Sequence, residues 1–185
     1  MDRAAPRVIA DAALRVARAS DALCLGVLAT QVFLDTYATG GIRSAIADEV
    51  LRSFSTSSMR EILARPGVSI LVAESEGHLV GFAQIAIGAG QARVATPHPA
   101  ELERLYVQEP FTGAGLGARL LGASEEDAAR RGARGLWLTP WVHNARALRF
   151  YARHGYADLG PTWFEMDGER HENRVLFKAL PSRTN

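Results

Sequence analysis

Cysteine is almost absent from the sequence, because Cys24 is the only one among 185 residues. One cysteine cannot form a disulfide within the chain, and it has no cysteine partner for a zinc site. A chain without structural disulfides is typical of a reducing compartment, so we expect a cytoplasmic protein. The five histidines show no metal-ligand spacing on a single expected helix, and the sequence therefore predicts no metal site.

A charge excess and a long apolar run are also missing. The formal net charge is +1, from 21 basic and 20 acidic residues, which argues against a nucleic-acid partner and a membrane surface. No apolar run is long enough to cross a bilayer, and residues 1–13 lack the apolar stretch of a secretory signal. We expect residues 1–13 to form a flexible tail and residues 14–185 to form a single domain.

Hydrophobic periodicity predicts helices early in the chain and strands afterwards. Helical spacing of apolar residues favours helices over 21–38, 42–54 and 59–64, with a polar hinge over 53–58. Further helices follow Gly117 and Asn144. Alternating patterns predict strands over 14–19, 68–74, 79–87, 100–107, 136–139, 162–166 and 174–178. The fold class is therefore α+β, with a mainly antiparallel sheet and one β-α-β crossover.

Three alternating glycines, Gly113, Gly115 and Gly117, stand between a strand and the crossover helix. Glycines let backbone amides turn inward, and amides at a helix N-terminus hold phosphate oxygens. An ordinary tight turn between strand and helix is the alternative interpretation. A Walker loop is excluded because no lysine follows the glycines, and the spacing differs from the dinucleotide-binding G-x-G-x-x-G. We therefore expect a nucleotide held through its pyrophosphate in another kind of fold.

Two motifs, taken together, resemble the GNAT superfamily of N-acetyltransferases. The first runs from the strand 101–107 into Thr112-Gly113-Ala114-Gly115-Leu116-Gly117. The second joins the strand 136–138, Asn144, Phe150-Tyr151 and Gly155-Tyr156. The resemblance extends over about residues 14–180, and its end regions are similar to the PaiA-like, polyamine-acetylating branch.

The resemblance implies a GNAT fold with six to seven strands, four to five flanking helices and central strands splayed by a β-bulge. It implies transfer of an acetyl group from acetyl-CoA to a primary amine of a small molecule or peptide, by direct attack through a tetrahedral intermediate. The residues that it places against acetyl-CoA are Leu105, Tyr106, Val107, Thr112, Gly113, Ala114, Gly115, Leu116, Gly117, Ala118, Asn144, Phe150 and Tyr151. Thr112 departs from the family pattern, which has Gln or Arg there, and this reduces charge complementarity to the phosphates.

The reaction needs a base for the amine, donors for the oxyanion and a proton for the departing thiolate. By family position, Tyr151 is the expected proton donor to the sulfur, although a buried core tyrosine is the alternative. Glu101 and Glu103 are the candidate bases, and alternation places them on the side of the strand that also carries Leu105 and Val107. Burial or mutual repulsion would raise a glutamate pKa enough for this role, whereas an ion pair with an arginine would make it structural.

The acceptor is the part that the motifs leave open. Phe33, Tyr37, Trp141 and His143 are the candidate pocket residues, with core packing as the alternative for Phe33. A polyamine would need several carboxylates, which Asp35, Asp48, Glu49, Glu165 and Asp167 could supply from what is equally a solvated face. A silent acyl-CoA sensor and a transferase acting on aminoacyl-tRNA are the other hypotheses, and the near-zero charge disfavours the second. A dimer is common among similar proteins, and the oligomeric state stays open.

Overall fold

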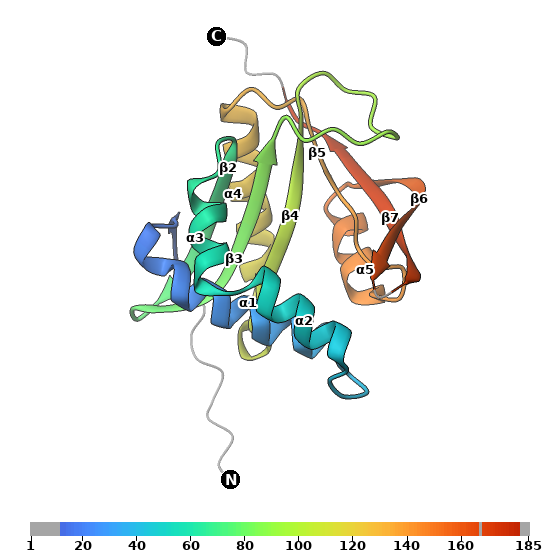
Figure 1. Cartoon of the computed structure of the whole chain (residues 1–185). Coiled ribbons are helices and arrows are strands. Elements are labelled where there is room, and N and C mark those ends of the chain that lie inside the picture. Colours follow the sequence, from blue (N-terminus) through green and yellow to red (C-terminus); the bar gives the residue numbers. More distant parts are fainter. Residues whose placement is uncertain (1–11, 167, 182–185) are drawn as a thin grey trace.

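The computed structural model describes residues 12–166 and 168–181, which contain a seven-stranded sheet (Figure 1). The strands are β1 (Ala13–Val16), β2 (Val68–Ser75), β3 (His78–Ile87), β4 (Pro99–Val107), β5 (Gly135–Leu138), β6 (Ala157–Met166) and β7 (Glu169–Ala179). Their order is β1-β2-β3-β4-β5-β7-β6, and only the β4–β5 pair is parallel. The predicted α+β class and mainly antiparallel sheet are confirmed.

The helices of the described residues are α1 (Ala22–Tyr37), α2 (Ser44–Ser53), α3 (Thr56–Ala64), α4 (Leu116–Arg130) and α5 (Ala145–Arg153). Two short 3-10 turns, η2 (Ala19–Asp21) and η3 (Glu109–Phe111), complete the set. The polar hinge predicted over 53–58 is wrong for its second half, where α3 has already begun. Ser55 is the reason, because its hydroxyl accepts a hydrogen bond from the Ser58 amide at 3.1 Å and so caps the helix.

Other boundaries differ by a few residues. β1 begins at Ala13 and ends at Val16, three residues short of the predicted end, because the 3-10 turn η2 replaces its last part. β6 and β7 are longer than predicted, since each extends the hairpin over residues whose alternation is weak. The flexible tail expected over 1–13 lies mostly outside the described residues, and within it Ala12 is buried against the core.

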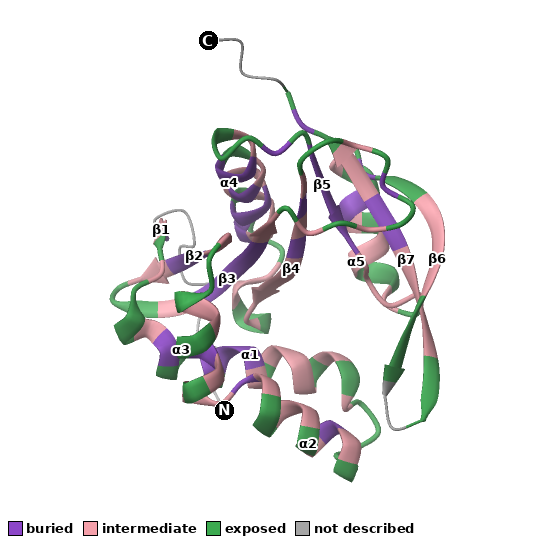
Figure 2. Cartoon of the chain, turned by 45° about the horizontal axis from the view of Figure 1, so that its top comes forward, coloured by how far each residue is buried: buried purple, intermediate pink, exposed green. Residues whose placement is uncertain are grey.

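Helices cover both faces of the sheet, so the protein has two cores (Figures 1 and 2). On one face, leucines of α4 pack against Val80 of β3 and Leu102 of β4. On the other face, Leu25 of α1 and Met59 of α3 pack against Phe82. Figure 2 shows buried residues on the inner sides of these elements. A sheet buried on both faces holds β4 firmly between the two helical layers.

A bulge changes the direction of side chains halfway along β4. Gln84 of β3 pairs with Arg104 while the next residue, Ile85, pairs with Leu102, so Glu103 is an extra residue on β4. Leu102 before the bulge and Leu105 after it therefore pack toward the same core. The prediction that Glu101 and Glu103 share a side with Leu105 and Val107 is consequently wrong. The two glutamates face α3 instead, where Glu103 meets Arg65.

Candidate active site

The strands β4 and β5 pair briefly and then separate. Only Pro99 to Glu101 of β4 pair with Gly135 to Trp137 of β5, although β4 continues to Val107. On its other edge β4 stays paired with β3 as far as Val107. Glu101 is thus the last residue of β4 that pairs with β5, and it lies where the two strands part.

Backbone groups of the separated part of β4 are open toward this gap. The Gln108 amide donates to the Val80 carbonyl at 3.1 Å, so the hydrogen-bonding residues of this stretch are the even-numbered ones. The amides and carbonyls of Leu105 and Val107 consequently point to the opposite edge, toward the gap. An extended ligand arm can pair with them as a further strand would.

The glycine loop presents unpaired amides beside that gap. Gly113 and Gly115 have φ angles of +81° and +83°, a backbone conformation that residues other than glycine rarely adopt. Among the described residues, the amides of Gly113, Ala114 and Gly115 donate no hydrogen bond, and α4 begins immediately afterwards. The first amides of a helix also lack partners within it, so the loop and the start of α4 together can accept an anion.

Thr112, which departs from the family pattern, forms a hydrogen bond within its own turn. Its hydroxyl donates to the Glu109 carbonyl at 2.8 Å, closing the turn η3 before the glycines. Glu109 in turn is 3.0 Å from Arg146 of α5, so this turn is tied to the helix that carries the second motif. Thr112 therefore shapes the loop, and the amides remain available for phosphate.

Helix α5 brings the residues of the second motif to the start of α4. The Asn144 side chain accepts from the Ala147 amide at 3.0 Å, which confirms the predicted cap. The ring of Phe150 lies 3.7 Å from the place where a Cβ on Gly117 would be. Phe150 of α5 therefore packs directly over the first turn of α4 at position 117.

The side chain of Tyr151 on α5 points toward the sheet and is only 7% exposed. The centroid of its ring lies 5.5 Å from that of Tyr156. Burial raises the pKa of Tyr151, and the phenols of Tyr106 and Tyr37 add to the effect. The hydroxyl consequently stays protonated throughout the neutral pH range. Since no described residue hydrogen-bonds to this hydroxyl, it is able to donate to a ligand.

The two candidate bases have different surroundings. Glu103 forms an ion pair with Arg65 at 2.7 Å and accepts a hydrogen bond from Gln84. Burial raises the pKa of Glu101 to about 7, and the charge of Glu103 adds to this, while Arg65 and Arg104 oppose it. A carboxylate with that pKa exchanges protons readily at neutral pH, as general base catalysis requires.

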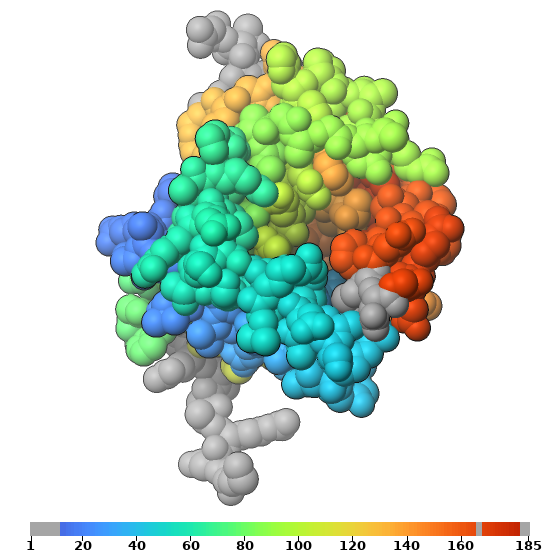
Figure 3. Space-filling model, viewed as in Figure 1, coloured from blue at the N-terminus to red at the C-terminus, as the bar shows by residue number. Residues whose placement is uncertain are grey.

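A pocket of about 620 Å³ opens between the α1–α2 segment and the β6–β7 hairpin. Figure 3 shows these two parts, cyan and orange-red, on either side of a hollow. Of the predicted acceptor residues, Phe33, Tyr37 and Trp141 line the pocket, and His143 stacks 5.0 Å from Trp141. Tyr106, expected at the cofactor, also directs its ring to this side.

Sequence reasoning missed most of the remaining pocket wall. The missed residues are Gly40, Gly41, Ile42, Arg43, Ile46, Phe164, His171 and Asn173. Phe164 and His171 are direct cross-strand partners, and Asn173 follows two residues later on the same face of β7. The alternation of β7 contained this signal, but it could not say which face meets α1.

An open strand edge, free amides and a near-neutral carboxylate suit acyl transfer from a carrier that has phosphates and an extended arm. Comparison with known proteins gives the family. Residues 41–156 match the model of the acetyltransferase (GNAT) family. The chain belongs to this family and is an acyl-CoA-dependent N-acetyltransferase that uses acetyl-CoA.

Relatives agree over most of the chain. An uncharacterised N-acetyltransferase of Lactobacillus delbrueckii subsp. lactis is 26% identical over 153 residues, which are 83% of this chain and 88% of that one. An uncharacterised N-acetyltransferase of Mycobacterium bovis is 34% identical over 134 residues, covering 70% and 81%. The PaiA N-acetyltransferase of Thermoplasma acidophilum, solved with coenzyme A, has the same fold, with a TM-score of 0.70 at 21% identity and coverage of 90% and 98%.

Residues 12–166 and 168–181 contain no helix that is both long and apolar enough to span a membrane. Within the same ranges, no three His, Cys, Asp or Glu side chains gather where they could hold a metal ion.

Proposed function

We propose that this protein, as one acetyltransferase domain over residues 14–185, acetylates a primary amine of a small molecule or peptide by direct attack on the thioester. The observation that carries the proposal is the position of Glu101. Its carboxyl, with a pKa of about 7, lies where β4 and β5 part. The acceptor pocket borders the same strand through Tyr106.

Acetyl-CoA supplies the acetyl group as a thioester. The residues present fit this co-substrate: the amides of residues 113–117 suit the pyrophosphate, and the Leu105 and Val107 backbone suits the pantetheine arm. The Val107 amide is the proposed donor to the oxyanion. Asn144 is proposed to touch the arm as well as capping α5, which contacts the start of α4 through Phe150.

Glu101 is the proposed base and Tyr151 the proposed acid. An amine of the lysine type has a pKa of about 10.4, so it binds mostly as an ammonium and must lose a proton before it attacks. Glu101 takes this proton directly or through water. Tyr151 stays protonated and donates a hydrogen bond to the departing sulfur. Glu103, held by Arg65, is less suited to the role of base.

The test is amine-dependent release of the CoA thiol by the purified chain, with Glu101→Gln beside the wild type. We expect turnover with at least one amine and a loss of about 100-fold or more in kcat/KM for Glu101→Gln. Binding of acetyl-CoA, measured by calorimetry, should be equal in the two proteins. Turnover that survives in Glu101→Gln would remove Glu101 from the mechanism.

A further inference from the structure

The walls of the acceptor pocket are mainly aromatic. The ring centroids of Phe33 and Tyr37, both on α1, lie 4.7 Å apart, and those of Tyr37 and Trp141 lie 5.8 Å apart. Tyr106 and Phe164 complete the rings around the pocket. Its volume of about 620 Å³ is that of a small-molecule site, and ring faces bury flat apolar groups well. The walls therefore favour an acceptor with a ring.

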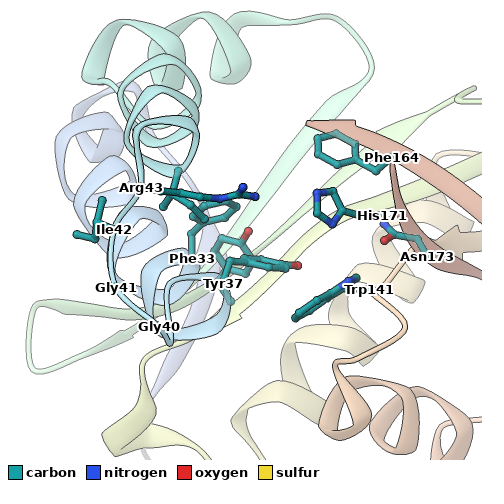
Figure 4. A pocket seen from close by; sticks show the side chains of 12 residues that line it. Phe33, Tyr37, Gly40, Gly41, Ile42, Arg43, Trp141, Phe164, His171 and Asn173 are labelled. Carbon is teal, nitrogen blue, oxygen red and sulfur yellow. The ribbon is translucent and has the colours of Figure 1, made fainter. Parts of the chain in front are cut away.

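Permanent charge in the pocket has one sign. None of the twelve described lining residues is Asp or Glu, and Arg43 is the one permanently charged residue among them. Figure 4 shows Arg43 reaching from the α1–α2 loop toward His171 and Phe164 on the hairpin. Its partner at the rim, Glu169, lies 3.4 Å away with both side chains about half exposed or more. Such an exposed pair contributes little and exchanges readily with a competing anion.

The carboxylates that could bind a polyamine do not line the pocket. Asp35, Asp48 and Glu165 are exposed and do not line the pocket. Glu49 forms an ion pair with Arg52 and accepts a hydrogen bond from the Ser53 hydroxyl at 2.6 Å. Asp167 lies outside the described residues. None of the described lining residues offers an acidic partner to a second ammonium, and Glu169 at the rim is already paired with Arg43.

Aromatic rings can hold a cation, so they alone do not exclude a polyamine. The reacting amine, however, must occupy the ring-lined end at Tyr106, on the strand that carries Glu101. A second ammonium at the other end would then approach Arg43, where like charges repel. Arg43 thus selects against acceptors with two positive charges.

The far end of the pocket also contains a buried polar atom without a partner. The Nε2 atom of His171 is buried and lacks a hydrogen-bond partner among the described residues. It lies 3.9 Å from Glu169, the same carboxylate that Arg43 meets. Arg43 and His171 therefore converge on a place that accepts a carboxylate, and a polar or anionic group of an acceptor can replace Glu169 there.

We propose, resting on the proposed transferase function, that the acceptor is an arylalkylamine, called an aryl amine below: a primary amine on an alkyl chain that is attached to an aromatic ring, with a neutral or anionic far end. Arg43 is the residue that determines the charge preference. Polyamines and peptide N-termini are the competing acceptor classes, and both are arms of the test.

The test compares three amines that share one ring and differ in the charge of the far end. They are 4-(2-aminoethyl)benzoate, phenethylamine and 1,4-bis(2-aminoethyl)benzene, with spermidine and an alanine tetrapeptide as competing classes. For the wild type we expect kcat/KM to fall in that order, with about tenfold between the first and the third amine. Higher kcat/KM for spermidine or for the tetrapeptide than for all three aryl amines would overturn the proposal.

Arg43→Glu should reverse the order of the two charged amines, with kcat/KM for phenethylamine as the reference within each protein. Arg43→Gln, which removes the charge without replacing it, should bring the two charged amines close together. Arg60→Glu makes the same charge change on an exposed residue of α3 outside the pocket, and it should keep the wild-type order. An unchanged order in both Arg43 variants would contradict the role of Arg43.

Binding is measured separately so that the two proposals can fail separately. Phenethylamine added to the CoA complex should change the tryptophan fluorescence to saturation, and Trp141→Phe should remove the change. Saturable binding of phenethylamine without turnover of any amine would overturn the transferase proposal alone. Turnover of spermidine without aryl-amine binding would overturn the aryl-amine proposal alone.

Discussion

The cofactor side of the site comes from one continuous stretch over residues 99–156, whereas the acceptor side is assembled from distant segments near residues 33–46, 106, 141 and 164–173. The proposed cofactor side also relies mainly on backbone groups: the Gly113 and Gly115 turns, and the open edge at Val107. The acceptor side works through side chains such as Tyr37, Trp141 and Arg43.

This difference explains which side can be read from sequence. A backbone site needs glycines and strand ends at fixed spacing, so it leaves a motif. A side-chain pocket needs only rings and charges that the fold brings together, and its residues have no spacing in common. The same fold can therefore keep one co-substrate and change its acceptor by replacing a few exposed side chains.

The largest effect expected from breaking the cofactor side alone comes from Gly115→Val. At a φ of +83° a β-branched residue is strongly strained, and the amides of the loop would turn away from the phosphates. We expect the Kd for acetyl-CoA, measured by calorimetry, to rise by about 100-fold. Gly122→Ala on the same helix has open space around it and should leave that Kd unchanged. Equal affinity in Gly115→Val would remove the loop from cofactor binding.

Tyr151→Phe should lower kcat by about tenfold, less than the loss expected for Glu101→Gln. Burial raises the pKa of Tyr151, so the phenol is a weak acid that donates a hydrogen bond more readily than a whole proton. Steady-state kinetics checks the ratio, and calorimetry should give an unchanged Kd for acetyl-CoA. An unchanged kcat would mean that Tyr151 only fills the core beside Tyr156.

A smaller effect should appear in the pH dependence when the neighbours of Glu101 are changed. Glu103 raises the pKa of Glu101 and Arg65 lowers it. Glu103→Gln should therefore move the acid limb of kcat to lower pH, and Arg65→Gln should move it to higher pH. If the acid limb moved in the same direction in both variants, the Glu103–Arg65 pair would act on Glu101 through packing instead of charge.

The smallest effects concern the two helix caps. Asn144→Ala and Ser55→Ala each remove one capping hydrogen bond, so each should lower the free energy of unfolding by about 1 kcal/mol in denaturant titrations. Only Asn144→Ala should also raise KM for acetyl-CoA, because only Asn144 is proposed to touch the cofactor arm. Equal KM values in both variants would leave Asn144 as a cap alone.

Local sequence signals predicted the class of fold, the glycine turn before α4 and the cap of α5. Gly113, Gly115 and the cap Asn144 are short-range features, and each has the expected conformation. The resemblance implied a β-bulge, but its position at Glu103 was not predictable, because that position depends on the register between β3 and β4. Without the bulge, alternation placed the two glutamates on the wrong face.

Long-range packing decided the rest of the site. Glu101 and Glu103 are equivalent in sequence, and the contacts of Glu103 with Arg65 and Gln84, together with the burial of Glu101, distinguish them in the structure. Arg43 belongs to a glycine-containing loop without a motif. His171 lines the same pocket from a hairpin more than a hundred residues later, and both side chains lie near Glu169. A side chain that acquires its role across such a separation leaves no local pattern.

The most direct test is the pH dependence of kcat at a saturating concentration of the best acceptor, for the wild type and Glu101→Gln. We predict that the wild-type kcat rises through pH 7 as Glu101 loses its proton, because the pKa of this carboxyl is about 7. We also predict that the rise is absent from the residual activity of Glu101→Gln. A wild-type profile that is flat across this range, or a rise that remains in Glu101→Gln, would contradict the assignment of Glu101 as the base.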